Sequence, residues 1–287
     1  MIINCAQPLF ATFVFDVGGV LLNTDTAAAK KILSGDLMRD WFAHWSPTRM
    51  KQIANRQFLY NYLHARRSAQ TGLEPQNKLV CDDKKQLMPD DLCDWLNGTL
   101  EIEQLVEKIN KQPAPKGFND TDKKLVCVIL EKTMLPESML AIMQPAKGIL
   151  KLLQECQRII DPSTGKPHEL WLLSNHNKRN LELLRTKFPE IFSLFTRVFV
   201  SGELGMSKPH PAIYQQVLNA HREKFGNQSI VLIDDQPENT RAGRKNGLDC
   251  ITHSTLANTQ RELQLRKMLN NDAKEKEDNI NETATKK

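Results

Sequence analysis

Short apolar runs, each leading into polar residues, recur along the chain and predict the strands of a buried parallel sheet. The first run, TFVFDVGGVLL, is rich in β-branched and aromatic residues and passes through Asp16 into a Gly-Gly turn. Further runs of the same kind are ELWLLSN, TRVFVSGELGMSKP, SIVLIDD and a short segment around Cys250 and Ile251. The polar residues of these runs therefore fall at the carboxyl ends of predicted strands.

Helical patterns follow several of these runs. The segments are NKRNLELLRTKF, PAIYQQVLNAHREKF and PENTRAGRK, the last of which is closed by Gly247. In the first segment, Leu181, Leu184 and Phe188 recur at the spacing of a helix face. Because strand and helix alternate, we predict an α/β fold with a doubly wound parallel sheet.

Residues 24–145 contain no comparable strand pattern and predict an inserted helical domain. Helical patterns such as MRDWFAHW, QFLYNYLHA and TLEIEQLVEKI are separated by the polar stretches QTGLEPQNK and NKQPAPKGFNDTDKK, which we interpret as loops. Six aromatic residues, expected mainly in the core of this domain, are Trp41, Phe42, Trp45, Phe58, Tyr60 and Tyr62. The predicted organisation is a discontinuous core of residues 1–23 and 146–260, a helical cap domain of residues 24–145, and a terminal helix with a disordered tail in residues 261–287.

Composition narrows the function classes. The 287 residues are 40% hydrophobic and 25% charged, as in an ordinary globular protein, and no apolar run approaches the ~20 residues of a membrane span. The N-terminal residues lack the pattern of a secretory signal, so we expect a cytoplasmic protein. Six cysteines without a CxxC pair favour buried thiols over a disulfide scaffold or a zinc site.

The net charge of +5 is spread along the chain without a basic stripe. Neither nucleic acid nor a membrane is therefore an expected partner, while an anionic small substrate is compatible with the charge. The sequence indicates no particular protein partner.

The polar residues at the strand ends form one candidate site, because an open α/β sheet gathers its ligands there. Asp16, beside a Gly-Gly turn that permits close backbone approach, suits a nucleophile. The Asp234-Asp235 pair offers the oxygen ligands that Mg²⁺ prefers. The groups suited to hold the oxygens of a transferring phosphoryl group are Ser174, Asn175 and Lys208.

Four ordered motifs resemble those of the haloacid dehalogenase (HAD) superfamily of hydrolases: FDVGGVLL, LLSN, SKPHPAIY and LIDDQPENTRAG. The sequence is most similar to the sugar-phosphate phosphatases and to the N-terminal phosphatase domain of soluble epoxide hydrolase. The resemblance covers about residues 9–23 and 146–253. It implies a HAD-like Rossmannoid core with a cap domain, and a Mg²⁺-dependent phosphatase that acts on a small phosphorylated substrate.

The same resemblance implies a role for each site residue. Asp16 would attack phosphorus and form an aspartyl-phosphate, which water then hydrolyses. Mg²⁺ would be bound by the Asp16 carboxylate, the Gly18 carbonyl and Asp235, and Asp234 would act from the outer shell. The phosphate-binding groups would be the Ser174 side chain and the Asn175 N–H, with Lys208 neutralising both the phosphate and the nucleophile.

Gly18 departs from the usual phosphatase motif, which has an aspartate here as the acid for the leaving alcohol and the base for water. Loss of such a proton shuttle costs about 10²–10⁴-fold in rate. Three hypotheses follow: a phosphatase with a good leaving group or a surrogate acid, a 2-haloacid dehalogenase, and a catalytically silent fold used for binding. Dehalogenases release halide without a proton, but they carry an aromatic residue at this position and do not need the Asp234-Asp235 pair. Intact Asp16, Lys208 and Asp235 argue against the silent fold.

Three further polar residues have both a functional and a structural interpretation. His176 could act as the surrogate acid, although a helix-start residue that faces solvent or a loop is favoured. Asp25 could supply a carboxylate from a flap, although an N-cap of the following helix is favoured. His210 could contact substrate, although a role in loop structure is favoured.

Overall fold

The computed structural model describes residues 11–29, 31, 56–71, 87–160, 165 and 167–269. The predicted disordered tail after residue 269 and the helical pattern MRDWFAHW, with Trp41, Phe42 and Trp45, lie outside these residues. No helix among the described residues combines the length and the apolar character that crossing a membrane requires.

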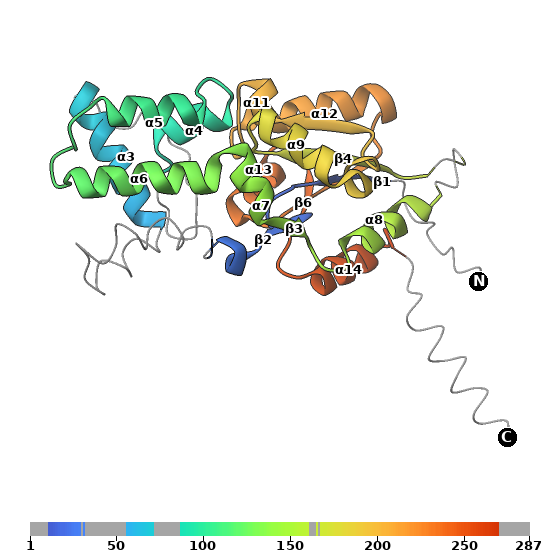
Figure 1. Ribbon diagram of the computed structural model, residues 1–287. Helices are drawn as coiled ribbons and strands as arrows, with labels where there is room; N and C mark the ends of the chain where they lie inside the picture. The colour runs from blue at the N-terminus through green and yellow to red at the C-terminus, as the bar shows by residue number, and fades with distance from the viewer. Residues whose placement is uncertain are drawn as a thin grey trace, which may run out of the picture.

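Five parallel strands form the central sheet (Figure 1). The strands are β1 (Ala11–Phe15), β4 (Glu169–Ser174), β5 (Arg197–Val200), β6 (Ser229–Asp234) and β7 (Asp249–Thr252), in the order β5-β4-β1-β6-β7. In the middle of the sheet, Val14 of β1 pairs with Trp171 on one side and with Leu232 on the other. The α/β fold with a parallel sheet, predicted from the alternation of strand and helix, is confirmed.

Helices cover both faces of this sheet, because alternate strand residues point to opposite sides. Phe13 and Phe15 belong to a core that also contains Leu152, Leu181 and Leu263. These leucines come from the helices of one face, α8 (Ile149–Arg158), α9 (Lys178–Lys187) and α14 (Leu256–Leu265), next to the short α10 (Pro189–Phe192). Val14 packs in a separate core on the other face, formed with α12 (Pro211–Phe225) and α13 (Pro237–Lys245).

A two-stranded antiparallel ribbon marks where the chain leaves the sheet region and returns to it. The ribbon pairs β2 (Leu22–Thr24) with β3 (Met143–Pro145). The helices between these strands in the sequence are α3 (Arg56–Thr71), α4 (Asp90–Leu96), α5 (Ile102–Asn110), α6 (Asp120–Met134) and α7 (Pro136–Ile142). Helices α3, α5 and α6 lie to the left of the sheet in Figure 1. We propose that α3–α7 form the cap domain.

Aromatic residues of α3 pack as expected for the interior of this helical region. Tyr60 and Tyr62 are buried, and Phe58 is partly buried against the same core. The rings of Phe58 and Tyr62 both meet Phe118 edge to face, which joins α3 to the loop before α6.

Polar contacts fix the helical region to the sheet region at α9 and at α11 (Ser201–Leu204). The buried Ser201 hydroxyl donates to the Leu96 carbonyl at the end of α4, at 2.6 Å. Arg179 of α9 pairs with Glu103 of α5 at 2.9 Å and with Glu137 of α7 at 3.2 Å. The Ser201 bond is the stronger tie, because exposed ion pairs contribute little.

The described cysteines form no disulfide among themselves. Cys93, Cys127, Cys156 and Cys250 are buried, as predicted for reduced thiols, and burial raises the pKa of the Cys127 thiol to about 11. Cys5 and Cys81 lie outside the described residues.

A buried ion pair joins α3 to α4, and its removal should destabilise the protein. The Arg66 guanidinium bonds to the Asp91 carboxylate at 2.5 Å, and both side chains are buried. Arg66→Met leaves Asp91 buried without its main partner, so we expect the free energy of unfolding in urea to fall by about 3 kcal/mol. Lys111→Ala removes only the exposed pair with Glu107 and should leave that free energy unchanged. Equal losses in the two variants would contradict this expectation.

Candidate active site

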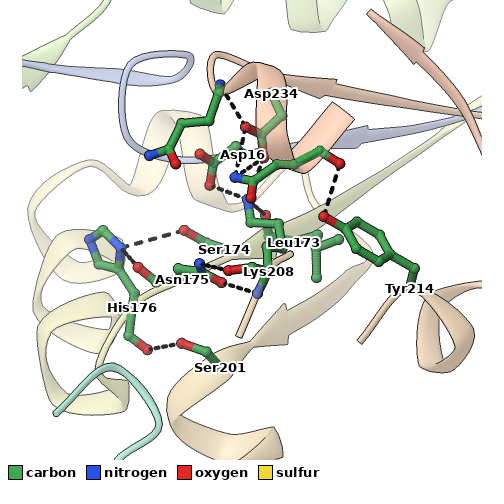
Figure 2. Close-up of polar contacts among 11 residues, drawn as sticks. Asp16, Leu173, Ser174, Asn175, His176, Ser201, Lys208, Tyr214 and Asp234 are labelled. Carbon is green, nitrogen blue, oxygen red and sulfur yellow. Dashed lines mark hydrogen bonds and ion pairs between the residues drawn. The ribbon is translucent and has the colours of Figure 1, made fainter. Parts of the chain in front are cut away.

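Three neighbouring strands bring the candidate residues together at one edge of the sheet (Figure 2). Asp16 follows β1, Ser174 ends β4, and Asp234 ends β6. Since β1 lies between β4 and β6, the carboxyl ends of all three meet. Lys208 reaches this point from the segment between α11 and α12.

The Lys208 ammonium is the centre of this cluster. Its Nζ atom lies 2.9 Å from Asp16 Oδ1, 2.6 Å from Asp234 Oδ2 and 2.9 Å from the Leu173 carbonyl oxygen. An ammonium has three hydrogens, so these three acceptors use all of them. Lys208 can therefore neutralise a bound anion by its charge while its hydrogen bonds hold the protein groups.

Burial and charge act in opposite directions on this lysine. Burial alone would lower the pKa of the Lys208 ammonium, but the carboxylates of Asp16 and Asp234 raise it above its ordinary value. Burial also raises the pKa of the Asp234 carboxyl. A protonated Asp234 would have no acceptor here, because Lys208, the Asn239 amide and the Gln236 N–H all donate to it. We therefore describe the Lys208–Asp234 pair as ionised.

Asp235 differs from Asp234 in that one of its two carboxylate oxygens lacks a donor among the described residues. Its Oδ1 atom is buried without a hydrogen-bond partner among the described residues. Burial, together with the nearby charges of Asp16 and Asp234, raises the pKa of the Asp235 carboxyl to about 7. The carboxylate is therefore destabilised unless a cation joins it.

The donor set fits a hard divalent cation. Carboxylate oxygens of Asp16, Asp234 and Asp235 all lie within 4.8 Å of one another. Lys208 supplies one positive charge against three carboxyl groups, so the cluster has an excess of two negative charges when all three are ionised. Since Asp234 is saturated by its donors, Asp16 and Asp235 are the side chains open to a Mg²⁺ ion.

The two glycines after Asp16 have different environments. Gly19 adopts a left-handed conformation with φ of 73°, and a Cβ atom there would lie 2.7 Å from Asp235 Cγ. Gly18 has no such conformation, and a Cβ atom there would meet nothing within 4 Å. Among the described residues, no hydrogen bond ends on the Gly18 carbonyl. Gly19 is thus required for the close approach of Asp235, while Gly18 has room for a side chain.

At the end of β4, the Ser174 hydroxyl lies close to His176, next to Asn175. The Asn175 side chain is engaged with the Lys208 backbone, accepting from its N–H and donating to its carbonyl, both at 2.7 Å. His176 Nδ1 lies 2.9 Å from the Asn175 carbonyl and 3.4 Å from Ser174 Oγ. Burial and the neighbouring Lys208 lower the pKa of His176 to about 4, despite the Asn175 carbonyl. His176 is therefore neutral at pH 7, which makes it a poor general acid.

Two other polar residues have structural roles. Asp25 Oδ1 accepts the backbone N–H groups of Ala27 and Ala28, both at 2.9 Å, as an N-cap does. His210 caps α12, because its Nδ1 accepts the Ala212 N–H at 3.2 Å. Both contacts agree with the structural interpretation favoured for these residues.

Sequence reasoning missed a residue that orients Asp234. The Asn239 amide donates to both Asp234 oxygens, at 3.0 and 3.1 Å, and Tyr214 donates to the Asn239 carbonyl at 2.9 Å. Asn239 lies in the first turn of α13, which begins shortly after β6. An amide in the helix turn that follows a strand-end carboxylate is the signal that could have found it.

A family model described as haloacid dehalogenase-like hydrolase matches residues 10–247 of the chain. This range includes every strand-end residue of the cluster.

Solved structures of similar proteins include a HAD family enzyme from Bacteroides thetaiotaomicron in complex with magnesium and inorganic phosphate. It is 14% identical, covers 85% of this chain and 94% of its own, and has a TM-score of 0.48. A 2-haloacid dehalogenase from Pseudomonas syringae pv. tomato is 15% identical, covers 84% of this chain and 85% of its own, and has a TM-score of 0.44.

The contrast between the two glycines can be tested by stability. Gly19→Ala forces an unfavourable backbone conformation and a clash with Asp235, so we expect the free energy of unfolding to fall by about 1–3 kcal/mol. Gly18→Ala is the matched control and should change it little. Urea denaturation of both variants measures the difference. A Gly19→Ala protein as stable as Gly18→Ala would contradict the required close approach.

Proposed function

Because the chain belongs to the haloacid dehalogenase-like hydrolases, we propose that it is a Mg²⁺-dependent phosphatase that acts on a small phosphate monoester. The observation that carries this proposal is the buried Lys208–Asp16 pair at 2.9 Å, beside a cluster with an excess of two negative charges. This combination suits a carboxylate nucleophile, a divalent cation and an anionic substrate together.

Asp16 is the proposed nucleophile. Lys208 binds its Oδ1 atom, and among the described residues no hydrogen bond ends on its other oxygen. Asp16 would attack phosphorus in line with the leaving oxygen, giving an aspartyl-phosphate, and water would then hydrolyse this acyl phosphate. Magnesium held by Asp16, Asp235 and the Gly18 carbonyl would supply positive charge to the phosphoryl oxygens.

The other residues bind and orient. The Ser174 hydroxyl and the Asn175 N–H would donate to phosphoryl oxygens, and Lys208 would balance their charge. Asp234 would act on Lys208, since its oxygens accept from Lys208, Asn239 and the Gln236 N–H. Asp234 therefore orients the ammonium that faces Asp16.

Gly18 limits the substrates that such a site can cleave quickly. No carboxylic acid occupies the position two residues after Asp16, and His176, with a pKa of about 4, is not in its acidic imidazolium form at pH 7. Esters whose leaving group departs as a stable anion need no acid. We therefore propose a substrate with a good leaving group.

Hydrolysis of p-nitrophenyl phosphate tests the function directly, because nitrophenolate leaves without a proton. We expect turnover with Mg²⁺, its loss in EDTA, and a loss on the order of 10³-fold or more in Asp16→Asn. Asp25→Asn changes a carboxylate that only caps a helix and should keep full activity. Metal-independent hydrolysis of 2-chloropropionate would instead support a dehalogenase, and no turnover of either compound would support a binding role.

Restoring an acid at position 18 should widen the range of leaving groups. Gly18→Asp has space for its side chain, and its carboxyl could protonate an alkoxide. We expect the rate on an alkyl phosphate, relative to p-nitrophenyl phosphate, to rise about 10²-fold. Gly18→Asn has nearly the same shape without the acid and should leave this ratio unchanged. An equal rise in both variants would show that shape, not proton transfer, is responsible.

A further inference from the structure

His176 has a partly buried side chain that the proposed mechanism does not use. Figure 2 shows its ring beside Ser174 and Asn175, on the strand end that would bind phosphate. Its Nε2 atom is buried and has no hydrogen-bond partner among the described residues. The position of the ring therefore depends on the hydrogen bonds of its other nitrogen, Nδ1.

The contacts of Nδ1 determine which nitrogen carries the hydrogen. A carbonyl oxygen can only accept a hydrogen bond, so Nδ1 must be the donor in its 2.9 Å contact with the Asn175 carbonyl. The imidazole is neutral at pH 7, which leaves Nε2 without a hydrogen. With the opposite tautomer, a lone pair of Nδ1 would face the carbonyl oxygen, and a buried N–H would have no acceptor.

This tautomer has a consequence for Ser174. Its Oγ atom lies 3.4 Å from His176 Nδ1, and among the described residues this hydroxyl makes no other hydrogen bond. Because Nδ1 carries a hydrogen, it can only donate in this contact, sharing its N–H between the Asn175 carbonyl and the Ser174 oxygen, so the proton of the Ser174 hydroxyl must point away from His176. The hydroxyl therefore keeps its donor capacity for a ligand.

Hydrogen bonds to its carbonyl oxygen hold the backbone of His176 in place. Its carbonyl accepts the Gly202 N–H at 3.1 Å and the Ser201 hydroxyl at 3.3 Å. A Cβ atom on Gly202 would lie 2.9 Å from this carbonyl oxygen, so the packing allows no larger residue there. Ser201 also bonds to Leu96, which connects the loop to the helical region.

We propose that His176 is a positioning residue: its Nδ1–H, bonded to the Asn175 carbonyl, directs the Ser174 hydroxyl proton toward a phosphoryl oxygen of the substrate. This inference rests on the proposed phosphatase function. His176 gives no proton to the leaving group, and its effect on the reaction passes through Ser174.

Two substitutions separate this role from a merely structural one. His176→Asn can place an amide N–H where Nδ1 lies, whereas His176→Leu fills the space without a donor. We expect His176→Leu to raise the inhibition constant of inorganic phosphate against p-nitrophenyl phosphate about tenfold, with Mg²⁺ affinity unchanged. His176→Asn should stay within about threefold of wild type. In a Ser174→Ala background, His176→Leu should have no further effect on phosphate binding.

A spectroscopic measurement on the unaltered protein completes the test. Nitrogen NMR of ¹⁵N-histidine-labelled protein should show His176 as the neutral Nδ1–H tautomer at neutral pH, with the resonance identified by its absence in His176→Asn. An Nε2–H tautomer would overturn the inference, even where a variant fails to fold.

The outcomes also separate the inference from the function on which it rests. A wild-type protein that binds no phosphate overturns both. Wild-type binding of phosphate with an unaffected His176→Leu overturns the positioning role alone. If the losses of phosphate affinity in His176→Leu and in Ser174→Ala add fully in the double variant, the positioning role is likewise overturned.

Discussion

The hydrogen bonds of one buried ammonium hold the site together. Lys208 joins the ends of three adjacent strands, through Asp16 after β1, the Leu173 carbonyl in β4 and Asp234 in β6. The backbone N–H and the carbonyl of Lys208 are both bonded to the Asn175 side chain. A buried ammonium without partners would destabilise the fold. The arrangement of the three strand ends therefore depends on carboxylates that accept from Lys208. The proposed nucleophile Asp16 and the loop proposed to bind phosphate are thereby fixed relative to each other.

The same cluster explains why the two adjacent aspartates differ. Asp234 accepts four hydrogen bonds from three donor groups and is part of the framework, whereas Asp235 has a buried oxygen without a partner among the described residues. Charge remains unbalanced where Asp235 approaches Gly19 and Asp16. A site of this kind gains most from a cation and from an anionic ligand bound next to that cation. In the proposed phosphatase, glycine at position 18 would leave the phosphoryl-binding groups intact while removing proton transfer, so that breakdown of an acyl phosphate would be slow.

The sequence predicted the core well because its strands are long apolar runs. The runs SIVLIDD and ELWLLSN correspond to β6 and β4, and PAIYQQVLNAHREKF coincides with α12. The strand-end rule then predicted that Asp16, Ser174 and Asp234 lie together. The β2–β3 ribbon was missed, because three-residue strands carry too few side chains for a periodic pattern. Asn239 was missed although it lies in the helix turn just after the strand-end acids, whereas the tautomer of His176 depends on the conformation and burial of the chain after β4, which no sequence pattern encodes.

The most direct test of a carboxylate nucleophile is to trap its phosphorylated form. Rapid acid quenching during turnover of p-nitrophenyl phosphate, followed by peptide mass spectrometry, locates any phosphoryl group on the chain. Slow hydrolysis without an acid-base residue at position 18 should let the intermediate accumulate. We expect a phosphoryl group on Asp16, and none in Asp16→Asn. Steady turnover with an unmodified Asp16 peptide, or a phosphoryl group on another residue, would contradict the proposed role of Asp16.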